Sequence, residues 1–575
     1  MAKWVPVNNG AEAFVELLSA NGVDCIFLNP GSDTVPIQEA LAKFRTLGKR
    51  TPEVILCPHE QVAMAAAHGY FMVSGKPQVV LVHVDVGTQQ VGGALHNTQR
   101  GRIGVIFCAG RSPSTFEGEK PGGRNRTVMW WQEPFDQASV VRGYVKWEYE
   151  LRFNENIHHV IQRAFQVATA EPCGPVYLTL PRELLMERVE RVQIPDPTRY
   201  SAASTPQADT NMLAKVAELL IPAREPLIIT GYSGRNTESV ASLVELAETL
   251  GARVITSDFQ MNFPTRHPLC RGINPNPYLK DADVILIIDH DMPYLLIGAK
   301  PRPEAKIIQI DIDPIKQNMP MWGFPVDIHL EADSSKAIPV LTELIRQKAP
   351  PAQQAEFQRR FQQRQKEHQQ LEAEWRDLAV RQAEQKPISP EWLSKSIAEV
   401  IDEDTIILNE TVTSSASVLR QIHRTKPGTL FGSGGSSLGW GLGAALGTKL
   451  AAPDKTVVSL VADGAFIYCC PTAALWAAGV YRAPFLCVIF NNGGYNAVRK
   501  NLQIAHGEDN FAEKIAGWAG LDIVQPPDYA LIAQAAHGYG QMVEDPSALK
   551  TVLKDALEQV HRGQPAVVDV MIGRT

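Results

Sequence analysis

The chain has 575 residues, of which 45% are apolar and 20% are charged, and its formal net charge at pH 7 is −7. This is ordinary globular composition, and the length predicts roughly three to five domains. The acidic balance, without a long basic run, argues against a nucleic-acid or anionic-membrane surface. Eight cysteines without a CxxC pair predict reduced, mostly buried thiols, as in a cytoplasmic protein.

The first residues, MAKWVPVNNGAEAF, lack the basic start and apolar core of a signal peptide. No apolar run reaches the ~18 residues of a membrane span. We therefore expect a cytoplasmic protein with neither a membrane nor a nucleic-acid partner.

Short apolar runs alternate with alanine-rich stretches in the first third of the chain. Each run ends in glycine, proline or polar residues and leads toward a helical stretch; the runs are 24–31, 53–58, 78–85 and 103–110. This is the βαβ pattern of a doubly wound parallel sheet, whose functional loops lie at the carboxyl ends of the strands. The unit closes near 174–184, and a polar, proline-bearing stretch around 190–210 is typical of a linker.

Two more α/β units follow. The strands expected in the second are 225–234, 251–256, 283–291 and 306–314, and those in the third are 405–413, 457–464, 485–492 and 566–573. Residues 352–386 are rich in Gln, Glu and Arg and predict a solvated connecting helix, with a charged linker as the alternative. The fold class is therefore α/β with three doubly wound parallel-sheet domains, at 1–188, 205–345 and 387–575, and a linker helix at 346–386.

The clearest local signal joins two strand ends in the third unit. Asp463 and Gly464 end one apolar strand, and Asn491 and Asn492 end another. Side chains at neighbouring parallel strand ends can reach one hard cation, and their oxygens suit Mg²⁺. The glycines let backbone N–H groups approach a diphosphate. An Asp-Gly turn alone is usually only a turn, but this pair after a glycine-rich helix start favours a magnesium-diphosphate site.

With these motifs the chain resembles the thiamine-diphosphate enzyme family that includes acetolactate synthase, benzoylformate decarboxylase, pyruvate decarboxylase and oxalyl-CoA decarboxylase. The family motif GDG, about two dozen residues and NN reads here ADG to NN, from Ala462 to Asn492. Alanine replaces the first glycine and the gap is slightly longer, but no ligand is lost. The resemblance covers nearly the whole chain and implies pyrimidine-binding, central and diphosphate-binding domains.

The resemblance also implies the residues at the cofactor. It makes Asp463, Asn492 and the backbone carbonyl of Gly494 the Mg²⁺ ligands, with Gly464, Ala465 and Tyr495 beside the cofactor. Thr413, in the segment 409–415, matches the diphosphate-side loop. The carbonyl of Ser436 would accept a hydrogen bond from N4′, and Leu438 would wedge under the cofactor to bend it. Taken alone, 436–441 is a glycine-rich helix start with a packing leucine.

Glu60 stands between a predicted strand and an alanine-rich helix. By itself it is a helix-start charge. The resemblance makes it the acid that hydrogen-bonds N1′ of the aminopyrimidine, where protonation favours the imino form that deprotonates thiazolium C2.

Three further residues belong to the expected substrate side. The opening FLNPGSDTVP resembles that of benzoylformate decarboxylase and implies that Ser32 meets a substrate carboxylate. His83 matches a catalytic histidine of that enzyme, although a lone strand-end histidine is often structural. Arg111 stands where related enzymes often carry glutamine; it could bind a carboxylate or phosphate, or pair with Glu117 or Glu119.

Other positions near the expected site carry weaker signals. His290 has no motif match, while Tyr495, Asn496 and Arg499 begin a segment that often contacts substrate in such enzymes. The sequence ends at its last predicted strand, so we expect no C-terminal lid of the kind that closes over a large acyl-CoA.

The resulting prediction is a thiamine-diphosphate- and Mg²⁺-dependent carbon–carbon lyase or ligase that acts on a 2-keto acid, by decarboxylation, acetolactate-type carboligation, or both. An oxalyl-CoA or 2-hydroxyacyl-CoA lyase is the alternative within the family. A non-catalytic relative is disfavoured because Glu60, Asp463 and Asn492 are intact. The resemblance implies a homodimer or homotetramer with active sites at the subunit interface.

A nicotinamide or flavin oxidoreductase is suggested by the βαβ units and the GYSGR segment at 231–235. It is disfavoured because no GxGxxG follows a first strand with an acid ~20 residues later. Since some relatives hold FAD in the middle unit, FAD stays open as a second cofactor.

Overall fold

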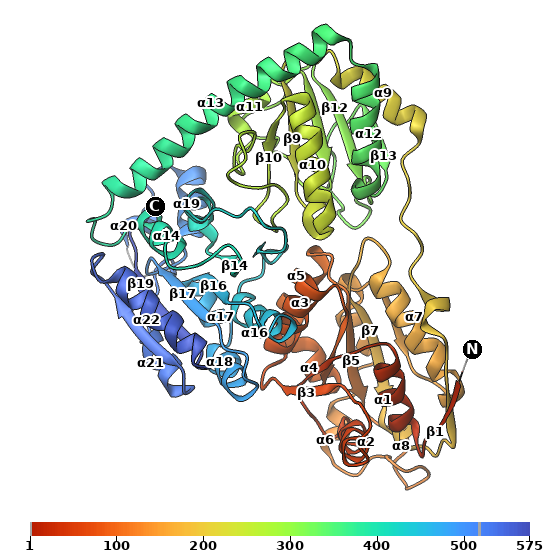
Figure 1. Cartoon of the computed structure of the whole chain (residues 1–575). Helices are drawn as coiled ribbons and strands as arrows, with labels where there is room; N and C mark the ends of the chain where they lie inside the picture. The colour runs from red at the N-terminus through yellow and green to blue at the C-terminus, as the bar shows by residue number, and fades with distance from the viewer. Residues whose placement is uncertain (1–2, 516–518, 575) are drawn as a thin grey trace.

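The computed structural model describes residues 3–515 and 519–574 and contains three parallel β-sheets, each between layers of helices (Figure 1). In Figure 1 the first unit is red to orange, the central unit yellow to green, and the third cyan to blue. The predicted fold class is confirmed, and the boundaries between the domains stay a prediction. Among the described residues, no helix combines the length and apolar character needed to cross a membrane.

The first unit is built on a six-stranded sheet in the order β3-β2-β4-β5-β7-β6, with every adjacent pair parallel. Its strands are β2 (Cys25–Leu28), β3 (Glu53–Leu56), β4 (Gln78–Val82), β5 (Val105–Arg111), β6 (Trp147–Glu150) and β7 (Val176–Pro181). Its helices are α1 (Gly10–Ala20), α2 (Val35–Thr46), α3 (Glu60–Ser74), α4 (Val84–Gln90), α5 (Gly92–Arg100), α6 (Val128–Trp131), α7 (Ile157–Thr169) and α8 (Arg182–Met186).

Residues of β2 show why both faces of this sheet are apolar. Ile26 and Leu28 enter one buried cluster, whereas Cys25 and Phe27 enter another on the opposite face. Successive side chains of a strand point to opposite faces, and a sheet covered by helices on both sides buries both sets.

The stretch predicted as a linker around 190–210 begins with a strand. β8 (Arg191–Ile194) pairs antiparallel with β1 (Lys3–Pro6) as a separate two-stranded sheet. This short ribbon carries charged residues and is half exposed, so its pattern resembles that of a polar loop.

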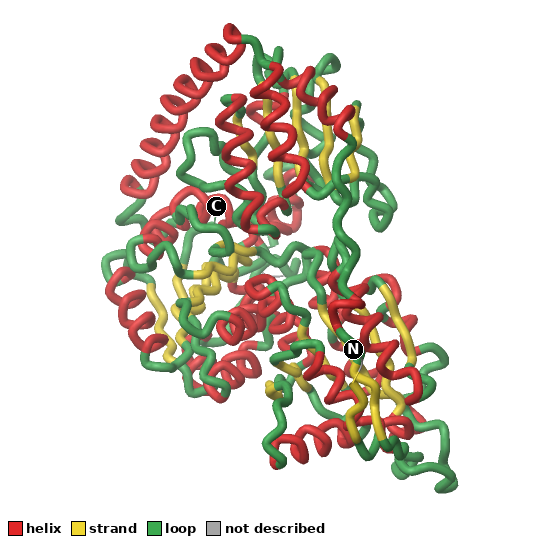
Figure 2. Tube along the Cα trace, turned by 45° about the vertical axis from the view of Figure 1, so that its right-hand side comes forward, coloured by secondary structure: helices red, strands yellow, loops and turns green. Residues whose placement is uncertain are grey.

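The central unit has a five-stranded parallel sheet in the order β10-β9-β11-β12-β13. Figure 2 shows its strands side by side between helices. The strands are β9 (Pro226–Thr230), β10 (Arg253–Ile255), β11 (Val284–Ile288), β12 (Lys306–Asp311) and β13 (Ile328–Glu331). The helices are α9 (Thr210–Leu220), α10 (Thr237–Leu250), α11 (Asn276–Leu279) and α12 (Ser334–Lys348).

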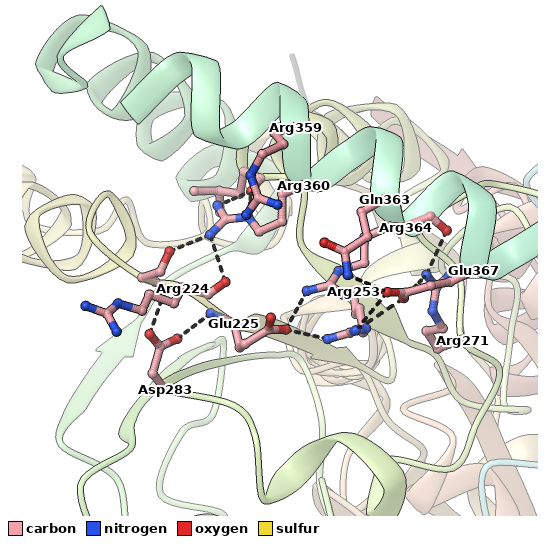
Figure 3. A network of polar contacts seen from close by, with 12 residues as sticks. Arg224, Glu225, Arg253, Arg271, Asp283, Arg359, Arg360, Gln363, Arg364 and Glu367 are labelled. Atoms are coloured by element: carbon pink, nitrogen blue, oxygen red, sulfur yellow. Dashed lines mark hydrogen bonds and ion pairs between the residues drawn. The ribbon is translucent and has the colours of Figure 1, made fainter. Parts of the chain in front are cut away.

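The polar segment after the central unit is a single helix, α13 (Pro351–Arg381), as expected. One face differs from the solvated helix of the prediction, because it buries Arg360 and Arg364 against the central unit (Figure 3). Arg360 donates from Nε to the carbonyl of Leu250 at 3.0 Å, and Arg364 pairs with Glu225 and Glu367. Carbonyls and the Glu225 carboxylate of the central unit, together with Glu367 of α13 itself, thus replace water around these arginines.

The third unit has a six-stranded parallel sheet in the order β15-β14-β16-β17-β19-β18. Its strands are β14 (Ile406–Glu410), β15 (Leu430–Phe431), β16 (Val457–Ala462), β17 (Leu486–Asn491), β18 (Tyr539–Val543) and β19 (Ala566–Met571). Its helices are α14 (Pro390–Ala398), α15 (Ser415–Gln421), α16 (Gly441–Ala451), α17 (Asp463–Tyr468), α18 (Pro471–Val480), α19 (Asn496–His506), α20 (Phe511–Lys514), α21 (Tyr529–Ala535) and α22 (Leu549–His561).

The first and third units meet along α3 and α16, near the centre of Figure 1. Small residues let the two backbones approach: a Cβ at Gly69 would lie 2.1 Å from the carbonyl oxygen of Ala444. A Cβ at Gly447 would lie 1.8 Å from the carbonyl oxygen of Ala66. One continuous apolar core therefore spans both sheets, and it fixes the two predicted halves of the site against each other.

Candidate functional site

Two adjacent strand ends carry the predicted metal ligands. Ala462, the last residue of β16, pairs in register with Phe490 of β17, so Asp463 and Asn492 leave the same edge of the sheet. Both carboxylate oxygens of Asp463 and the Oδ1 of Asn492 are buried, and none has a hydrogen-bond partner within the described part of the chain. Buried oxygens without donors are costly in a folded protein unless a ligand satisfies them. A hard cation is such a ligand.

Electrostatics at this edge favour a bound cation. Burial raises the pKa of Asp463, and the surrounding N–H groups, among them that of Gly464, lower it without satisfying either oxygen. Asp569 on β19 accepts a hydrogen bond from Asn491 Nδ2 at 3.0 Å. Burial raises the pKa of Asp569 to about 6, and Asp463 adds to the rise. A cation would relieve both carboxylates.

The predicted ligand set is made of hard oxygen donors. Among the described residues, no cluster of three or more His, Cys, Asp or Glu could hold a metal ion, so a cation here would need amide and carbonyl oxygens as well. The carbonyl of Gly494 accepts the N–H of Asn496 at 3.2 Å and keeps a second lone pair. The residues present therefore fit Mg²⁺, which takes oxygen ligands and keeps positions for phosphate.

Several positions next to the predicted metal ligands require glycine, because neighbouring atoms of the protein lie too close for a side chain. A Cβ at Gly494 would lie 2.3 Å from the carbonyl oxygen of Leu521, and Gly493 has a φ of +73°. A Cβ at Gly464 would lie 3.0 Å from the Tyr495 ring, so Tyr495 covers that turn. Ala465, one residue further, is fully buried in α17.

Glu60 is the first residue of α3, and His59 caps the helix by accepting the N–H of Gln61 at 3.2 Å. The Glu60 side chain is 9% exposed, and a Cβ at Gly87 would lie 3.2 Å from its Oε1. Burial raises the pKa of the Cys470 thiol, and the negative charge of Glu60 adds to the rise. Glu60 of the first unit therefore lies close to Cys470 of the third unit within one chain.

The loop that carries Leu438 is held from both units. Gln61 Nε2 donates to the carbonyl oxygens of Leu438 and Gly439 at 3.3 and 3.2 Å. Ser436 donates its N–H to His96 Nε2 on α5 at 3.2 Å. The predicted wedge and the predicted N4′ acceptor thus belong to a loop that contacts the helix of Glu60.

Glu410, at the end of β14, supports the same loop, and the sequence analysis missed it. Its carboxylate accepts the N–H groups of Gly439 and Gly441 at 2.7 and 2.8 Å, and that of Trp440 at 3.2 Å. Burial raises the pKa of Glu410 to about 7, although these N–H groups lower it. The available signal was an acid that directly follows an apolar strand within a motif-bearing segment.

Thr413 lies half-buried in the 3₁₀ turn Val412–Ser414 that follows β14. The preceding Val412 has a φ of +54°, a conformation that β-branched residues rarely adopt. Backbone strain of this kind is concentrated at functional sites, and it agrees with the position predicted for the diphosphate-side loop.

His83 directly follows β4 and has partners on both ring nitrogens. Nδ1 contacts the buried carboxylate of Asp33, and Nε2 lies 2.9 Å from the Gln132 amide nitrogen. The hydrogen bond to Asp33 raises the pKa of His83, although burial opposes the rise. Gly31 lies against the ring, since a Cβ there would be 2.0 Å from His83 Nδ1, which places neighbouring Ser32 at the same strand edge. Asp33 and Gln132 are further residues that the sequence analysis missed.

Arg111 has a different partner from those predicted. It pairs with Glu150, which ends β6, while the strand between them, β7, aligns both ends. Pairing with Glu117 or Glu119 is therefore wrong, because Glu119 turns back to accept the N–H groups of Phe116 and Glu117. The ion pair needs a strand pairing that the sequence analysis did not include.

Three residues with weaker sequence signals have defined surroundings in the structure. His290 lines an apolar pocket that also contacts Ser436, and burial lowers its pKa to about 4. Arg499 donates to Asp522 Oδ1 at 2.6 Å, an acceptor that Arg574 shares. Asn496 is buried at the start of α19.

Three family models match the chain in order along its length. The N-terminal TPP-binding domain of thiamine pyrophosphate enzymes matches residues 8–140, the central domain 213–341, and the C-terminal TPP-binding domain 411–570.

Curated relatives and solved structures agree with these matches. Benzoylformate decarboxylase of Pseudomonas aeruginosa is 27% identical over 85% of this chain and 86% of its own. A probable acetolactate synthase large subunit of Methanocaldococcus jannaschii is 25% identical over 98% and 92%. The structure of a thiamine diphosphate-dependent 4-hydroxybenzoylformate decarboxylase of Rhodococcus jostii superposes with a TM-score of 0.78 at 22% identity, over 99% of each chain.

Proposed function

The chain belongs to the thiamine pyrophosphate enzymes, and from this premise we propose that it is a Mg²⁺-dependent lyase or ligase of 2-keto acids. The bond next to the keto group would be broken by decarboxylation, formed by carboligation, or both. One observation carries the proposal: three buried oxygens of Asp463 and Asn492 have no hydrogen-bond partner among residues 3–515 and 519–574, at the strand edge where a magnesium diphosphate would be held. The names of the benzoylformate decarboxylase and acetolactate synthase relatives support the substrate class.

Residues of the third unit would hold the cofactor. Asp463, Asn492 and the carbonyl of Gly494 would bind Mg²⁺, and the N–H groups of Gly464 and Ala465 with Thr413 would face the diphosphate. When bound, thiamine diphosphate supplies the electron sink for cleavage or formation of the bond to the keto carbon. Because Gly464 and Gly494 carry no side chain, the Tyr495 ring and the Leu521 carbonyl can pack against these turns and hold them in place.

Residues at the other end would manage the proton. Glu60 would hold a proton at N1′, the Ser436 carbonyl would accept the N4′ hydrogen, and Leu438 would support the bend between the rings. Glu410 holds the backbone that follows Leu438, and it therefore positions the loop without touching substrate.

On the substrate side we propose that Ser32 and His83 bind the carboxylate of the 2-keto acid. Because Nδ1 of His83 bonds to Asp33, the neutral ring keeps its lone pair on Nε2, which accepts from the Gln132 amide; a substrate that displaces Gln132 could exchange a proton there. Arg111 is already neutralised by Glu150, so we propose that it aligns the ends of β5 and β6 and does not bind substrate.

The decisive test is the Glu60→Gln variant, assayed with thiamine diphosphate and Mg²⁺ on pyruvate, benzoylformate and oxalyl-CoA, with and without an aldehyde acceptor. We expect wild-type turnover of a keto acid and a loss of about 10²- to 10⁴-fold in the variant. Glu39→Gln on the exposed face of α2 is the matched control. Full activity of Glu60→Gln would refute the mechanism, and selective turnover of oxalyl-CoA would favour the acyl-CoA lyase alternative.

We further propose a homodimer or homotetramer that places active sites between subunits. The family resemblance supports this assembly, while the α3–α16 contact already joins the two units within one chain. Sedimentation of the purified protein distinguishes these assemblies from a monomer, and a mixture of two inactive variants, Glu60→Gln and Asp463→Asn, would regain activity if each site draws on two chains.

A further inference from the structure

A large apolar pocket lies between the central unit, α5 and the loop before Leu438. Its volume is about 900 Å³, near the upper end for small-molecule sites. Side chains of the central unit supply most of its wall, namely Met292, Leu295, Leu296, Ile297, Met321 and Trp322. Several of them face solvent: Ile297 is 84% exposed and Met321 is 96% exposed. An exposed apolar surface of this size is typical of a binding site.

The pocket adjoins the proposed catalytic centre. Gly434, Gly435 and Ser436 form one of its walls, and Ser436 is the residue whose carbonyl is proposed to meet the aminopyrimidine. His96, which accepts the Ser436 N–H, lines the same wall. A group attached to the reacting carbon could therefore extend from the cofactor loop into the pocket.

The charges around the pocket argue against a nucleotide as its occupant. Asp291 pairs with Arg102 and Lys316 at 2.9 Å each, and both cations also face Asp311. Both cations are neutralised by these carboxylates, although Nη1 of Arg102 has no hydrogen-bond partner among the described residues, so neither is a free charge for a diphosphate. Arg100 remains at the rim, where Nη1 and Nη2 make long contacts of 3.4 and 3.5 Å to the Asn318 carbonyl.

Two polar side chains on the wall, His290 and Trp322, are neutral, whereas Asp291 and Arg100, which also line the pocket, are charged. Burial lowers the pKa of His290 to about 4, and its Nδ1 accepts the Met292 N–H at 3.1 Å, so the proton lies on Nε2. The Trp322 indole donates to the Asp291 carbonyl at 2.6 Å and presents its apolar ring. Between these groups the wall offers mainly apolar contact, which suits a hydrocarbon group, and the Nε2–H of His290 is a hydrogen-bond donor on it.

We propose that this pocket binds the extended apolar side chain of the substrate, so that the preferred substrate is a 2-keto acid with a long hydrocarbon group. The inference rests on the proposed function and adds the substrate class. It assigns Leu295, Leu296 and Ile297 as specificity-determining residues. A small keto acid such as pyruvate would leave most of the pocket without contacts.

Two measurements on the full-length holoenzyme test the proposal. The first is kcat/KM for straight-chain 2-keto acids from pyruvate to 2-oxodecanoate. Each buried methylene should raise kcat/KM by about 4-fold until the pocket is full, which corresponds to ~0.8 kcal/mol. The second is calorimetric binding of decanoate, a probe that cannot be turned over.

Leu295→Glu is the informative variant, because it places a charge on the pocket wall where the leucine is 58% exposed. It should lower the ratio of kcat/KM for the longest and shortest substrates by at least about ten-fold and abolish decanoate binding. Leu47→Glu, at the end of α2, is the matched control because Leu47 is 62% exposed. The control should leave both measurements unchanged.

The outcomes separate this inference from the proposed function. Turnover that does not depend on chain length would overturn the inference and leave the function standing. If no keto acid is turned over, the function fails, while decanoate binding that Leu295→Glu abolishes still supports an apolar site. Flavin absorbance in the purified protein would make a flavin the occupant of the pocket and overturn the inference. An equal loss of kcat/KM on all substrates in Leu295→Glu, together with dissociation to a monomer, would make a second subunit the occupant and overturn it as well.

Discussion

The buried carboxylate of Glu410 allows a quantitative prediction. Glu410→Gln keeps the size of the side chain and removes its ionisation beneath the loop of Leu438. The amide oxygen can still accept from a backbone N–H, but one of the two carboxylate acceptors is lost, at a cost that does not depend on pH. The informative quantity is therefore how the difference in the free energy of unfolding between variant and wild type changes with pH.

The magnitude follows from the pKa of Glu410, which burial raises from its ordinary 4.5 to about 7. Between these values the folded protein keeps a proton that the unfolded chain releases, so the free energy of unfolding falls as pH rises. The full loss is about 3 kcal/mol at 1.36 kcal/mol per tenfold change in proton affinity. The glutamine variant has no such proton, and relative to wild type it should gain about 3 kcal/mol between pH 4.5 and pH 8.

Urea unfolding at pH 4.5, 6, 7 and 8, followed by tryptophan fluorescence, measures this difference. Other titrating groups, such as Asp569, contribute equally to both proteins and cancel when the two are compared. Glu39→Gln, on the exposed face of α2, is the control for loss of a surface carboxylate and should change the free energy of unfolding by less than about 0.5 kcal/mol. A variant-minus-wild-type difference that is the same at pH 4.5 and pH 8 would refute the reasoning.

Three other changes test the remaining parts of the structure. Asp463→Asn should abolish the rise in Tm that Mg²⁺ with thiamine diphosphate gives wild type, and calorimetry of both proteins would contradict the assignment if their cofactor affinities were equal. Asp33→Asn removes the carboxylate that raises the pKa of His83. The part of the pH profile of kcat/KM that depends on His83 should therefore move to lower pH. An unchanged pH profile would exclude the role assigned to His83. In wild type the stabilisation from this pair is complete below about pH 6.5 and is lost as pH rises through the higher folded pKa of His83, so Asp33→Asn should cost more stability at pH 5 than at pH 9. Arg360→Met leaves the carbonyls of Leu250 and Ala223 buried without their donor, and chemical denaturation should show a loss of about 1–3 kcal/mol, whereas the exposed neighbour Arg359→Met should cost less than about 0.5 kcal/mol.

Strands in the middle of each sheet could be predicted from sequence because both of their faces are buried. β4 and β11 have five buried residues each, and apart from Gln78 at the start of β4 these residues are all apolar. The edge strands β6 and β18 were missed, because one lacks any fully buried residue and the other has two exposed positions. An edge strand pairs on one side and is partly solvated, so its sequence resembles that of a loop.

Some residues of the candidate site could likewise be predicted from sequence, and others could not. Asp463, Asn492 and Glu60 could be selected because each belongs to a motif at a strand end or a helix start. Asp33 and Glu410 act through partners that are 50 and 29 residues away in the chain. No local pattern distinguishes such an acid from an ordinary charge in a loop, since its function depends on which backbone or ring it meets after folding.

Arg111 illustrates the same limit in the opposite direction. Nearby acids in the following loop made Glu117 and Glu119 the obvious partners, whereas the order β5-β7-β6 brings the distant Glu150 beside it. The order and register of the strands decide which strand ends lie side by side, and both are properties of the assembled sheet.

The glycines between α3 and α16 have a consequence for how this enzyme can vary. A methyl group at Gly69 or Gly447 would meet the main chain of the opposite helix, which cannot move aside as a flexible side chain could. The thickness of this contact sets how far the first and third units of one chain stand from each other. Alanine at either glycine should therefore displace one unit relative to the other, and in an assembly whose sites draw on two chains this would misplace Glu60 in each site, so catalysis would be lost through geometry even in a chain that still folds.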